Sequence, residues 1–392
     1  MSMIDNFKFY LQTQLEYGVG QARKIGDFLA EKSFQDVVVV GDEGVANNSP
    51  YFDELITIIK VTAKKTTVQV VRGTEEPDYD YLDEIATRIR GIDKIDLIVG
   101  IGGGSCLDIT KAVAILKNNA GKGIDYRGFD KIQNPGIPTL AIPTTAGTGS
   151  EVTNNAVFTD KKEMKKLGIN GRFMNATYAI LDAEGTISCP YSVALSSGID
   201  ALTHALESFT CQKANALSRT FSKEAFCLLY NALPCLVDDP HNRQKRQELL
   251  LGSYLAGAAL FNSGSGIAGA LSYPIGVHFN VPHGIGGGIF LESVIEYNIL
   301  KGYSYYADLL SMIDNEEGLT IDRKNKKFFY LMRGLFERLN VPKYLDNWGI
   351  TKNNVEHVGK LMLPLQAAFD QNPIPFSAAT DASKFLRMHV KP

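Results

Sequence analysis

The sequence has few features of a secreted, disulfide-bonded or membrane-spanning protein. Its five cysteines are Cys106, Cys189, Cys211, Cys227 and Cys235. They are odd in number and no two show CxxC spacing, which argues against a disulfide framework and against a thiolate zinc site. No segment approaches the roughly 20 apolar residues of a membrane-spanning helix. The N-terminus, MSMIDNFKFYLQTQLEYG, has no basic region followed by an apolar run. We therefore expect a soluble, cytoplasmic protein without a membrane partner.

An excess of charge of one sign is also missing. The chain has 40 Lys and Arg against 43 Asp and Glu, for a net charge of -3. Binding to a nucleic-acid backbone depends on a surplus of basic side chains, so we expect no nucleic-acid partner. At 392 residues the chain is long enough for two domains, each with its own core.

The first half of the chain alternates short β-branched runs with helical patterns. Continuous apolar runs bounded by Gly, Asp or Pro predict buried parallel strands at residues 36–42, 66–71, 95–105 and 138–145. Helical patterns lie between them, for example at 20–32 and 80–91, and residues 177–185 are expected to form the last strand. This alternation predicts a doubly wound, mainly parallel sheet with helices on both faces.

From Pro190 onward the sequence consists of long Ala- and Leu-rich windows without strand alternation, interrupted by a charged surface stretch at 314–327. The predicted fold is therefore an α/β domain at residues 1–187, followed by an all-α domain at residues 188–392. Because no low-complexity linker separates the halves, we expect a tight boundary with a ligand-binding cleft between them.

Two glycine-rich loops follow predicted strands. In IVGIGGGSCLDITKAVAI (98–115), Gly102, Gly103 and Gly104 would let the backbone approach a phosphate, which the N–H groups of the helix start can hold. The loop in PTTAGTGSEVTNNAVFTD (143–160) offers N–H and O–H donors to a pyrophosphate or a nicotinamide amide. Taken alone, each loop is also consistent with a tight turn that binds nothing.

Asp42 ends the run DVVVVGD, where a dinucleotide-binding sheet often places an acid on the ribose hydroxyls of adenosine. In the common dinucleotide fingerprint the glycines come first and the acid follows about 20 residues later. Here the acid precedes the glycines by two strands, so the pattern is not that of a plain Rossmann fold.

A carboxylate and an imidazole stand four residues apart in GIDALTHALESF (198–209). On a helix, Asp200 and His204 would project from the same face. Such a pair is either a surface contact or part of a metal site.

Together these motifs resemble one family, the iron-containing or group III alcohol dehydrogenases, which share their fold with dehydroquinate synthase and glycerol dehydrogenase. The resemblance runs from about Tyr17 to Asn372. It rests on GGGSCLDITKA, PTTAGTGSEVTNNAVFTD, GIDALTHALESF and NSGSGIAGALSYPIGVHFNVPHG.

The resemblance implies a dinucleotide cofactor, NAD(P), held by residues of the first half. Its diphosphate would lie on Gly102, Gly103, Gly104 and Ser105, and its nicotinamide side would be lined by Thr144, Thr145 and Thr148. Asp42 would contact the adenosine ribose. An acid there repels a 2′-phosphate, so NAD is preferred over NADP.

The resemblance also implies one divalent metal ion, Fe or Zn, held by an Asp and three His. Asp200, His204 and His283 match three of these ligands, but Gly269 stands at the place of the fourth. Tyr273 stands where a second histidine of the site often assists proton transfer. Two imidazoles and a carboxylate still give the ligand count of a catalytic metal site.

The remaining ligand position has three candidates: water, a substrate oxygen or His278. The alternative is a site without metal, in which Asp200 and His204 form a hydrogen-bonded pair. In that case Tyr273 becomes the candidate acid or base, assisted by His283 or His278.

The implied reaction is oxidation of a primary or secondary alcohol to a carbonyl, with metal-assisted alkoxide formation and hydride transfer to NAD(P). Gly269 and Tyr273 suggest room for a bulkier, more polar substrate, such as a sugar or sugar acid. Three other readings remain open: a dehydroquinate synthase-like lyase, oxidase-like chemistry at an open iron site without nicotinamide turnover, and a non-catalytic NAD-binding protein.

The expected partner is a small-molecule alcohol or carbonyl compound. Family members are commonly dimers, and an edge strand formed by FKFYLQTQLEYG (7–18) would mediate the pairing of a homodimer.

Overall fold

The computed structural model describes residues 6–73, 76–315 and 317–392, and its contacts divide the chain into two compact units. The α/β unit comprises residues 11–190 and 241–250. The helical unit comprises the segment up to Tyr10, residues 191–240 and residues 251–392. The α/β unit thus ends its main segment at Pro190, whereas the sequence suggested a boundary at residue 187.

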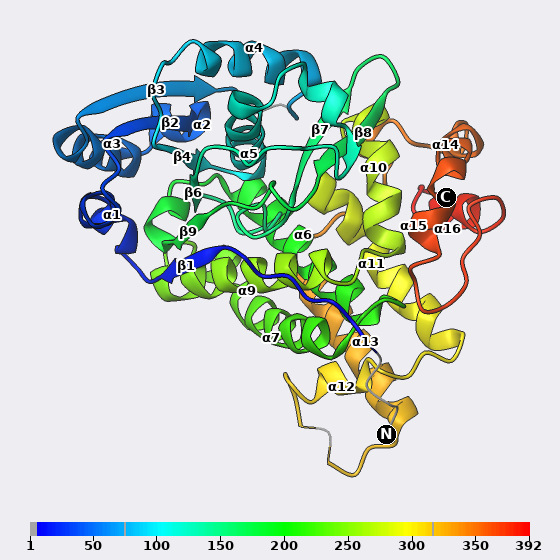
Figure 1. Ribbon diagram of the computed structural model, residues 1–392. Coiled ribbons are helices and arrows are strands. Elements are labelled where there is room, and N and C mark those ends of the chain that lie inside the picture. The colour runs from blue at the N-terminus through cyan, green and yellow to red at the C-terminus, as the bar shows by residue number, and fades with distance from the viewer. Residues whose placement is uncertain (1–5, 74–75, 316) are drawn as a thin grey trace. The chain divides into compact units, whose positions relative to one another are not determined.

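A six-stranded sheet forms the centre of the α/β unit (Figure 1). In spatial order its strands are β1 (Gln14–Tyr17), β9 (Tyr178–Leu181), β6 (Thr139–Pro143), β4 (Leu97–Gly102), β2 (Asp36–Asp42) and β3 (Lys65–Val71). Every neighbouring pair is parallel. The predicted mainly parallel sheet is confirmed.

Strand β2 shows why the sheet is covered on both faces, since its side chains alternate between them. Val37 and Val39 belong to one apolar core with α1 (Ile25–Lys32) and α3 (Pro50–Thr62). Val38 and Val40 belong to another with α4 (Tyr79–Arg90) and α5 (Gly104–Asn118). A strand buried on both faces is apolar along its length, which is the continuous run seen in the sequence. Shorter helices of this unit are η1 (Gln21–Lys24), α2 (Glu43–Asn48), η2 (Gly123–Tyr126) and η3 (Ala183–Thr186).

A second, three-stranded sheet was not anticipated. It consists of β5 (Gly128–Phe129), β8 (Lys165–Asn170) and β7 (Asn155–Asp160), in that order. The end of the predicted loop 143–160 is therefore the strand β7, which pairs antiparallel with β8. Its residues alternate between buried and half-buried, the period-two pattern of a strand with one covered face.

The order of strands explains the unusual spacing between the acid and the glycines. After β3 the chain crosses to the other side of β2 and forms β4, so β2 and β4 are neighbours. Their register pairs Gly41 with Ile101, which brings the carboxyl ends of the two strands together. Asp42 and Gly102 thus meet at a topological switch point, where open α/β sheets bind ligands.

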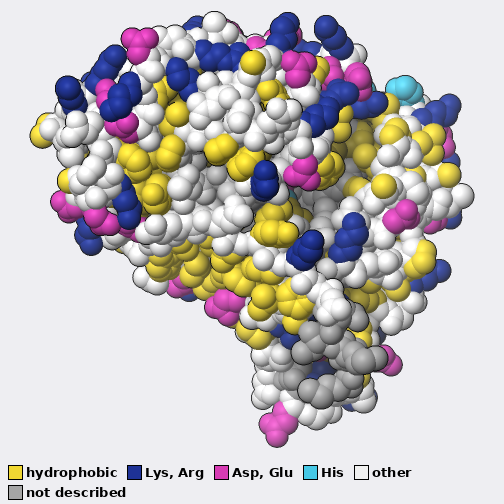
Figure 2. Space-filling model, in the orientation of Figure 1, with side chains coloured by type: hydrophobic (Ala, Val, Ile, Leu, Met, Phe, Trp, Pro, Cys, Tyr) yellow, Lys and Arg dark blue, Asp and Glu magenta, His cyan; other side chains and the backbone are white. Residues whose placement is uncertain are grey.

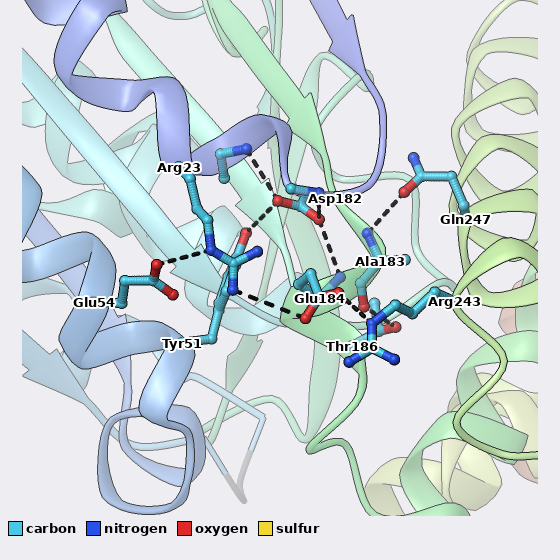
Figure 3. A network of polar contacts seen from close by, with 11 residues as sticks. Arg23, Tyr51, Glu54, Asp182, Ala183, Glu184, Thr186, Arg243 and Gln247 are labelled. Atoms are coloured by element: carbon cyan, nitrogen blue, oxygen red, sulfur yellow. Dashed lines mark hydrogen bonds and ion pairs between the residues drawn. The ribbon is translucent and has the colours of Figure 1, made fainter.

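A polar network at the carboxyl end of β9 holds distant segments of the α/β unit together (Figure 3). The fully buried Asp182 accepts hydrogen bonds from the N–H of Gly20 at 2.8 Å and from the hydroxyl of Tyr51 at 3.1 Å. Glu184 forms an ion pair with Arg243, and the side chain of Gln247 bonds to the backbone of Leu181 and Ala183. These contacts explain why residues 241–250 belong to this unit.

The regular elements in the described residues of the helical unit are all helices, as predicted. They are α6 (Tyr191–Thr210), α7 (Ala216–Ala232), α8 (Cys235–Asp238), the part of α9 (Arg243–Phe261) from Leu251 onward, α10 (Ile267–Phe279), α11 (His283–Leu300), α12 (Ala307–Leu310), α13 (Ile321–Arg338), η4 (Asp346–Trp348), α14 (Val355–Leu361), η5 (Leu363–Leu365), α15 (Gln366–Phe369) and α16 (Ala382–Met388). Helix α13 begins at Ile321, inside the charged stretch 314–327. Within the described residues, no helix has both the length and the apolar character needed to cross a bilayer.

Charged side chains of both signs are interspersed over the face seen in Figure 2. On this face no extended field of one sign forms, in line with the nearly balanced composition.

Candidate active site

Helices α6, α10 and α11 pack against one another and bring three potential metal ligands together (Figure 1). Asp200 and His204 lie one turn apart on α6, and His283 is the first residue of α11. The Oδ1 atom of Asp200 is 3.5 Å from Nε2 of His204 and 3.7 Å from Nε2 of His283. All three donor atoms lie within 4.8 Å of one another.

These spacings fit a single divalent ion. Two donors each about 2.0–2.2 Å from a tetrahedral ion lie roughly 3.4 Å apart, close to the separations found here. The donor set is also suitable, because two imidazoles and one carboxylate are the ligands of many catalytic zinc and iron sites. Asp200 is buried and both imidazoles are partly buried, so the donors are shielded from bulk water.

Two consecutive residues of α10 contact the imidazole of His283. The Oγ atom of Ser272 is 2.7 Å from Nδ1, and the ring of Tyr273 lies against the imidazole with 4.7 Å between ring centroids. Tyr273 therefore lies beside one of the three donors. His278 is exposed near the end of α10 and is not part of the donor cluster found among the described residues.

Gly269, which stands at the place of the missing ligand, lies in the first turn of α10 beside Glu207. The carboxylate of Glu207 is buried and accepts hydrogen bonds from the backbone N–H groups of Gly266, Ala268 and Gly269 and from the hydroxyl of Ser265. Burial raises the pKa of Glu207, although these donors act in the opposite direction. The carboxylate thereby caps the start of α10.

The expectation that Gly269 leaves room for a larger substrate is wrong for the space next to its Cα. A Cβ atom at this position would lie 2.8 Å from Oε2 of Glu207 and 2.8 Å from Oγ of Ser265. The position that a Cβ atom would take is thus closely approached by two neighbouring side chains, which the sequence could not reveal.

In the α/β unit, the glycine turn after β4 is packed so closely that side chains are excluded. A Cβ on Gly102 would lie 2.7 Å from Cβ of Asp42, and one on Gly104 would lie 2.6 Å from Oγ1 of Thr148. The helix α5 begins at Gly104 and has no side-chain cap, so its first N–H groups can be offered to an anion. Such a cradle fits the diphosphate of a dinucleotide.

The other residues expected to contact the cofactor lie around this turn, at different depths. Ser105 is half-buried in the first turn of α5, and Thr145 flanks Gly103 at a distance of 3.4 Å from its would-be Cβ. Thr148 is exposed beside Gly104. Thr144 is buried, and its N–H bonds to the carbonyl of Gly102 at 3.0 Å, so it anchors the loop to β4.

The two carboxylate oxygens of Asp42 differ in their contacts with the described residues. Oδ1 accepts hydrogen bonds from the N–H groups of Gly44 at 2.8 Å and Val45 at 3.2 Å, which caps α2. Among the described residues, Oδ2 accepts no hydrogen bond. Burial raises the pKa of Asp42, and the two N–H donors oppose this shift. The free oxygen suits a ribose hydroxyl, which can donate to it.

A buried ion pair, which sequence reasoning missed, fixes the second loop to α5. Asp108 accepts hydrogen bonds from the hydroxyl of Ser150 at 2.5 Å and the N–H of Val157 at 2.8 Å. Lys111 lies 3.3 Å from Asp108 and donates to the carbonyl of Ser150 at 2.8 Å. Burial raises the pKa of Asp108 and lowers that of Lys111. The charge on each residue stabilises the charged form of the other and so opposes these two shifts. The only signal in the sequence was the i, i+3 spacing after the glycines, which usually marks a surface pair.

Glu151 in the same loop is also buried, and burial raises its pKa to about 7. Glu207 and Ser272 in the helical unit were missed as well. Glu207 follows His204 by three residues on the same face of α6, which is a usable signal. The sequence gives no such signal for Ser272, since His283, which its hydroxyl contacts, is eleven residues away in another helix.

The two units thus combine the glycine turn of a nucleotide-binding protein with the donor set of a metalloenzyme, and comparison with known proteins agrees. Residues 12–183 match the sequence model of the family described as iron-containing alcohol dehydrogenase. Residues 194–383 match the C-terminal model of the Fe-containing alcohol dehydrogenase family. The chain belongs to this family and is an oxidoreductase of the alcohol dehydrogenase type.

Individual relatives cover most of the chain. Long-chain-alcohol dehydrogenase 1 of Geobacillus thermodenitrificans (strain NG80-2) is 32% identical over 290 residues, 73% of each chain. Sulfoacetaldehyde reductase of Bilophila wadsworthia (strain 3_1_6) is 27% identical over 373 residues, 94% of this chain and 95% of that one. The crystal structure of a 1,3-propanediol oxidoreductase matches with a TM-score of 0.89 at 25% identity, covering 97% of this chain and 99% of the other.

Proposed function

We propose that this protein interconverts a small alcohol and the corresponding carbonyl compound, with NAD as the redox cofactor and one divalent metal ion, Fe or Zn, at Asp200, His204 and His283. The observation that carries the proposal is the convergence of these three donors from α6 and α11 at separations suited to one ion. Relatives named as a long-chain-alcohol dehydrogenase and a sulfoacetaldehyde reductase support a substrate with a hydroxyl or aldehyde group.

The chemistry that a divalent ion supplies at such a site is polarisation of the substrate hydroxyl, which favours loss of its proton, while nicotinamide accepts the hydride. The carboxylate of Asp200 contributes the one negative charge of the donor set, and the two imidazoles contribute none when they act as ligands. Because the donors are partly buried, their electrostatic effect on the substrate is stronger than it would be in water.

Tyr273 is the best-placed candidate for moving the substrate proton, since its ring lies against His283. His278 is the weaker candidate because it is exposed and lies outside the donor cluster. In the α/β unit, Gly102, Gly103, Gly104 and Ser105 would hold the diphosphate, with Thr145 and Thr148 beside it and Thr144 supporting the loop. Asp42 would accept from the adenosine ribose and select NAD.

The test is a steady-state assay of NADH formation with protein loaded with Fe²⁺ or Zn²⁺, using propanol, butanol, 1,3-propanediol and a sugar alcohol. We expect alcohol-dependent NADH formation that is abolished in His204→Ala. Because relatives are named as a long-chain-alcohol dehydrogenase and a 1,3-propanediol oxidoreductase, we expect the short alcohols and the diol to react faster than the sugar alcohol. Peroxide production without NADH would instead support oxidase-like chemistry, and NAD binding without turnover would contradict the proposal.

We also propose that the protein is a cytoplasmic homodimer without nucleic-acid or membrane partners. All five cysteines lie in the described part of the chain and none forms a disulfide bond, which suits a reducing compartment. Strand β1 forms one edge of the six-stranded sheet. It ends at the exposed Tyr17, and the exposed side chains of Leu11 and Val19 flank it in the sequence. An edge strand flanked by apolar side chains is a ready surface for pairing with a second copy.

A further inference from the structure

The imidazole of His283 is contacted by described residues on several sides. Its Nδ1 atom is 2.7 Å from Oγ of Ser272, its ring lies against Tyr273, and its Nε2 atom faces Oδ1 of Asp200 at 3.7 Å. Ser272 itself is buried, with 1% of its surface exposed, so water has little access to this contact. The orientation of the imidazole is therefore fixed mainly by protein atoms.

The direction of the hydrogen bond follows from the other contact of Ser272. Its hydroxyl donates to the carbonyl of Gly269 at 2.6 Å, and a carbonyl oxygen can only accept. A hydroxyl has one proton, so its oxygen must accept in the contact with His283. Nδ1 of His283 is then the protonated nitrogen, and Nε2 carries the lone pair on the side of Asp200 and His204.

The second imidazole of the cluster lacks such a support. Nδ1 of His204 is buried and has no hydrogen-bond partner among the described residues. Its Nε2 atom lies 3.5 Å from Oδ1 of Asp200. Among the described residues, no group thus hydrogen-bonds to Nδ1 of His204, whereas Ser272 contacts Nδ1 of His283.

Close packing of α10 against α11 keeps Ser272 in place. A Cβ atom on Gly286, in the first turn of α11, would lie only 3.1 Å from Cβ of Ser272. The absence of a side chain at Gly286 allows the two helices to approach, and His283 begins the same helix turn.

We propose that Ser272 is a positioning residue that sets the tautomer and ring orientation of His283, so that Nε2 presents its lone pair to a metal ion shared with Asp200 and His204. The inference rests on the proposed function. Gly269 supplies no imidazole ligand, but its backbone carbonyl contributes to the orientation of Ser272, because it accepts the hydrogen bond from the Ser272 hydroxyl. Hydrogen-bond partners of metal-bound histidines typically change metal affinity 10–100-fold when removed.

The experiment compares Ser272→Ala with the matched control Ser222→Ala. Ser222 is likewise a fully buried helical serine whose hydroxyl makes two hydrogen bonds, to the carbonyl of Ser218 and to Ser208, and it does not touch the donors. Two quantities are measured on each protein. The first is the tautomer of His283 by ¹⁵N NMR of the metal-free, histidine-labelled protein, assigned with His283→Gln. The second is the affinity for Zn²⁺ by competition with a chelator.

We expect a protonated Nδ1 on His283 in the unaltered protein and in Ser222→Ala, and a shift toward a protonated Nε2 in Ser272→Ala. We expect Zn²⁺ affinity to fall about 10–100-fold in Ser272→Ala and to stay within threefold in Ser222→Ala. A protonated Nε2 in the unaltered protein overturns the inference without need of any variant. Unchanged affinity in Ser272→Ala also overturns it, while the proposed function stands. If the unaltered protein binds no Zn²⁺ or Fe²⁺, the proposed function itself is contradicted and the inference falls with it.

Discussion

Gly269 illustrates how a single position can be recognised in the sequence and still be misjudged. Its place in the pattern identifies it as the position of a missing histidine, but the sequence gives no view of its neighbours. In the structure, Glu207 and Ser265 fill the space beside its Cα, and Glu207 is held by four donors. The absence of a side chain at Gly269 thus allows Glu207 and Ser265 to pack closely against the start of α10.

Replacing this glycine should destabilise the helical unit. In Gly269→Ala, the new Cβ would approach Glu207 and Ser265 to 2.8 Å, so we expect a loss of about 1–3 kcal/mol from overpacking. The control is Gly334→Ala in α13, where nothing lies within 4 Å of the new atom. Alanine there should be neutral or stabilising by about 0.5–1 kcal/mol. Thermal unfolding measures both, and equal or higher stability of Gly269→Ala would contradict the packing account.

Asp42 gives a second prediction at the residue scale. Asp42→Asn removes the charge but keeps an oxygen to accept from the N–H groups of Gly44 and Val45, so the cap of α2 is retained. Without the repulsion of a 2′-phosphate, we expect the ratio of kcat/KM for NADP to that for NAD to rise at least tenfold. An unchanged ratio in a variant that remains folded would show that Asp42 does not select the cofactor.

Only part of the candidate site could be predicted from the sequence. Asp200 and His204 could be paired from their spacing on one helix, because that geometry is local. His283 entered only through the family resemblance, since 79 positions separate it from His204 along the chain. Ser272 owes its role to the packing of α10 against α11, which no local pattern encodes. For Glu207, the local spacing indicates the face of α6 on which it lies, but its contacts with α10 depend on packing.

At the scale of elements, the parallel strands were the most predictable part of the fold. The apolar run at 36–42 corresponds to β2, because a strand buried on both faces must be apolar throughout. The run at 66–71 corresponds closely to β3, but β3 is an edge strand with several exposed side chains, so the prediction that it is buried is wrong. The hairpin of β7 and β8 was missed, since its strands have one covered face and contain Asn, Asp, Lys and Gly. Such strands are held by their partners more than by their own propensity.

The loop between β6 and β7 gives a prediction about pH. Burial raises the pKa of Glu151 to about 7, whereas an unfolded Glu titrates near 4.3. Between these values the folded state binds more protons than the unfolded state, so this contribution to stability is full below about pH 4.3 and is lost as the pH rises through 7. Glu151→Gln removes it.

We therefore expect the melting temperature of Glu151→Gln to improve relative to the unaltered protein between pH 5 and pH 8. The comparison of the two profiles isolates Glu151 from the nearby pair of Asp108 and Lys111, which also titrate abnormally. Two parallel profiles across this range would show that Glu151 does not titrate near neutral pH.

At the scale of the whole molecule, the exposed apolar side chains beside β1 predict self-association. We expect a dimer in sedimentation, and a shift to monomer in Leu11→Lys/Val19→Lys, because lysines on a strand edge oppose pairing. Val61→Lys is the matched control, since Val61 is 82% exposed on α3 in the same unit. A dimer that survives the double substitution would place the interface elsewhere.

The sequence indicated the division of the chain into an α/β unit and a helical unit, because alternating strand and helix patterns give way to helical patterns alone near residue 190. It did not indicate the assignment of residues 241–250 to the α/β unit, because this depends on side chains such as Gln247 and Arg243 meeting the end of β9 (Figure 3). Composition can separate two kinds of secondary structure, but it cannot show where a helix from one half contributes to the other.

The central claim is that Asp200, His204 and His283 suffice to hold one catalytic metal ion although Gly269 replaces a fourth ligand. The most direct test is the metal content of protein purified without chelators or immobilised-metal chromatography, with His204→Ala as the control. The account predicts close to one Fe or Zn per chain, lost in His204→Ala. Absence of stoichiometric metal from the unaltered protein, even after incubation with Fe²⁺ or Zn²⁺, would contradict it and leave Tyr273 as the candidate acid or base.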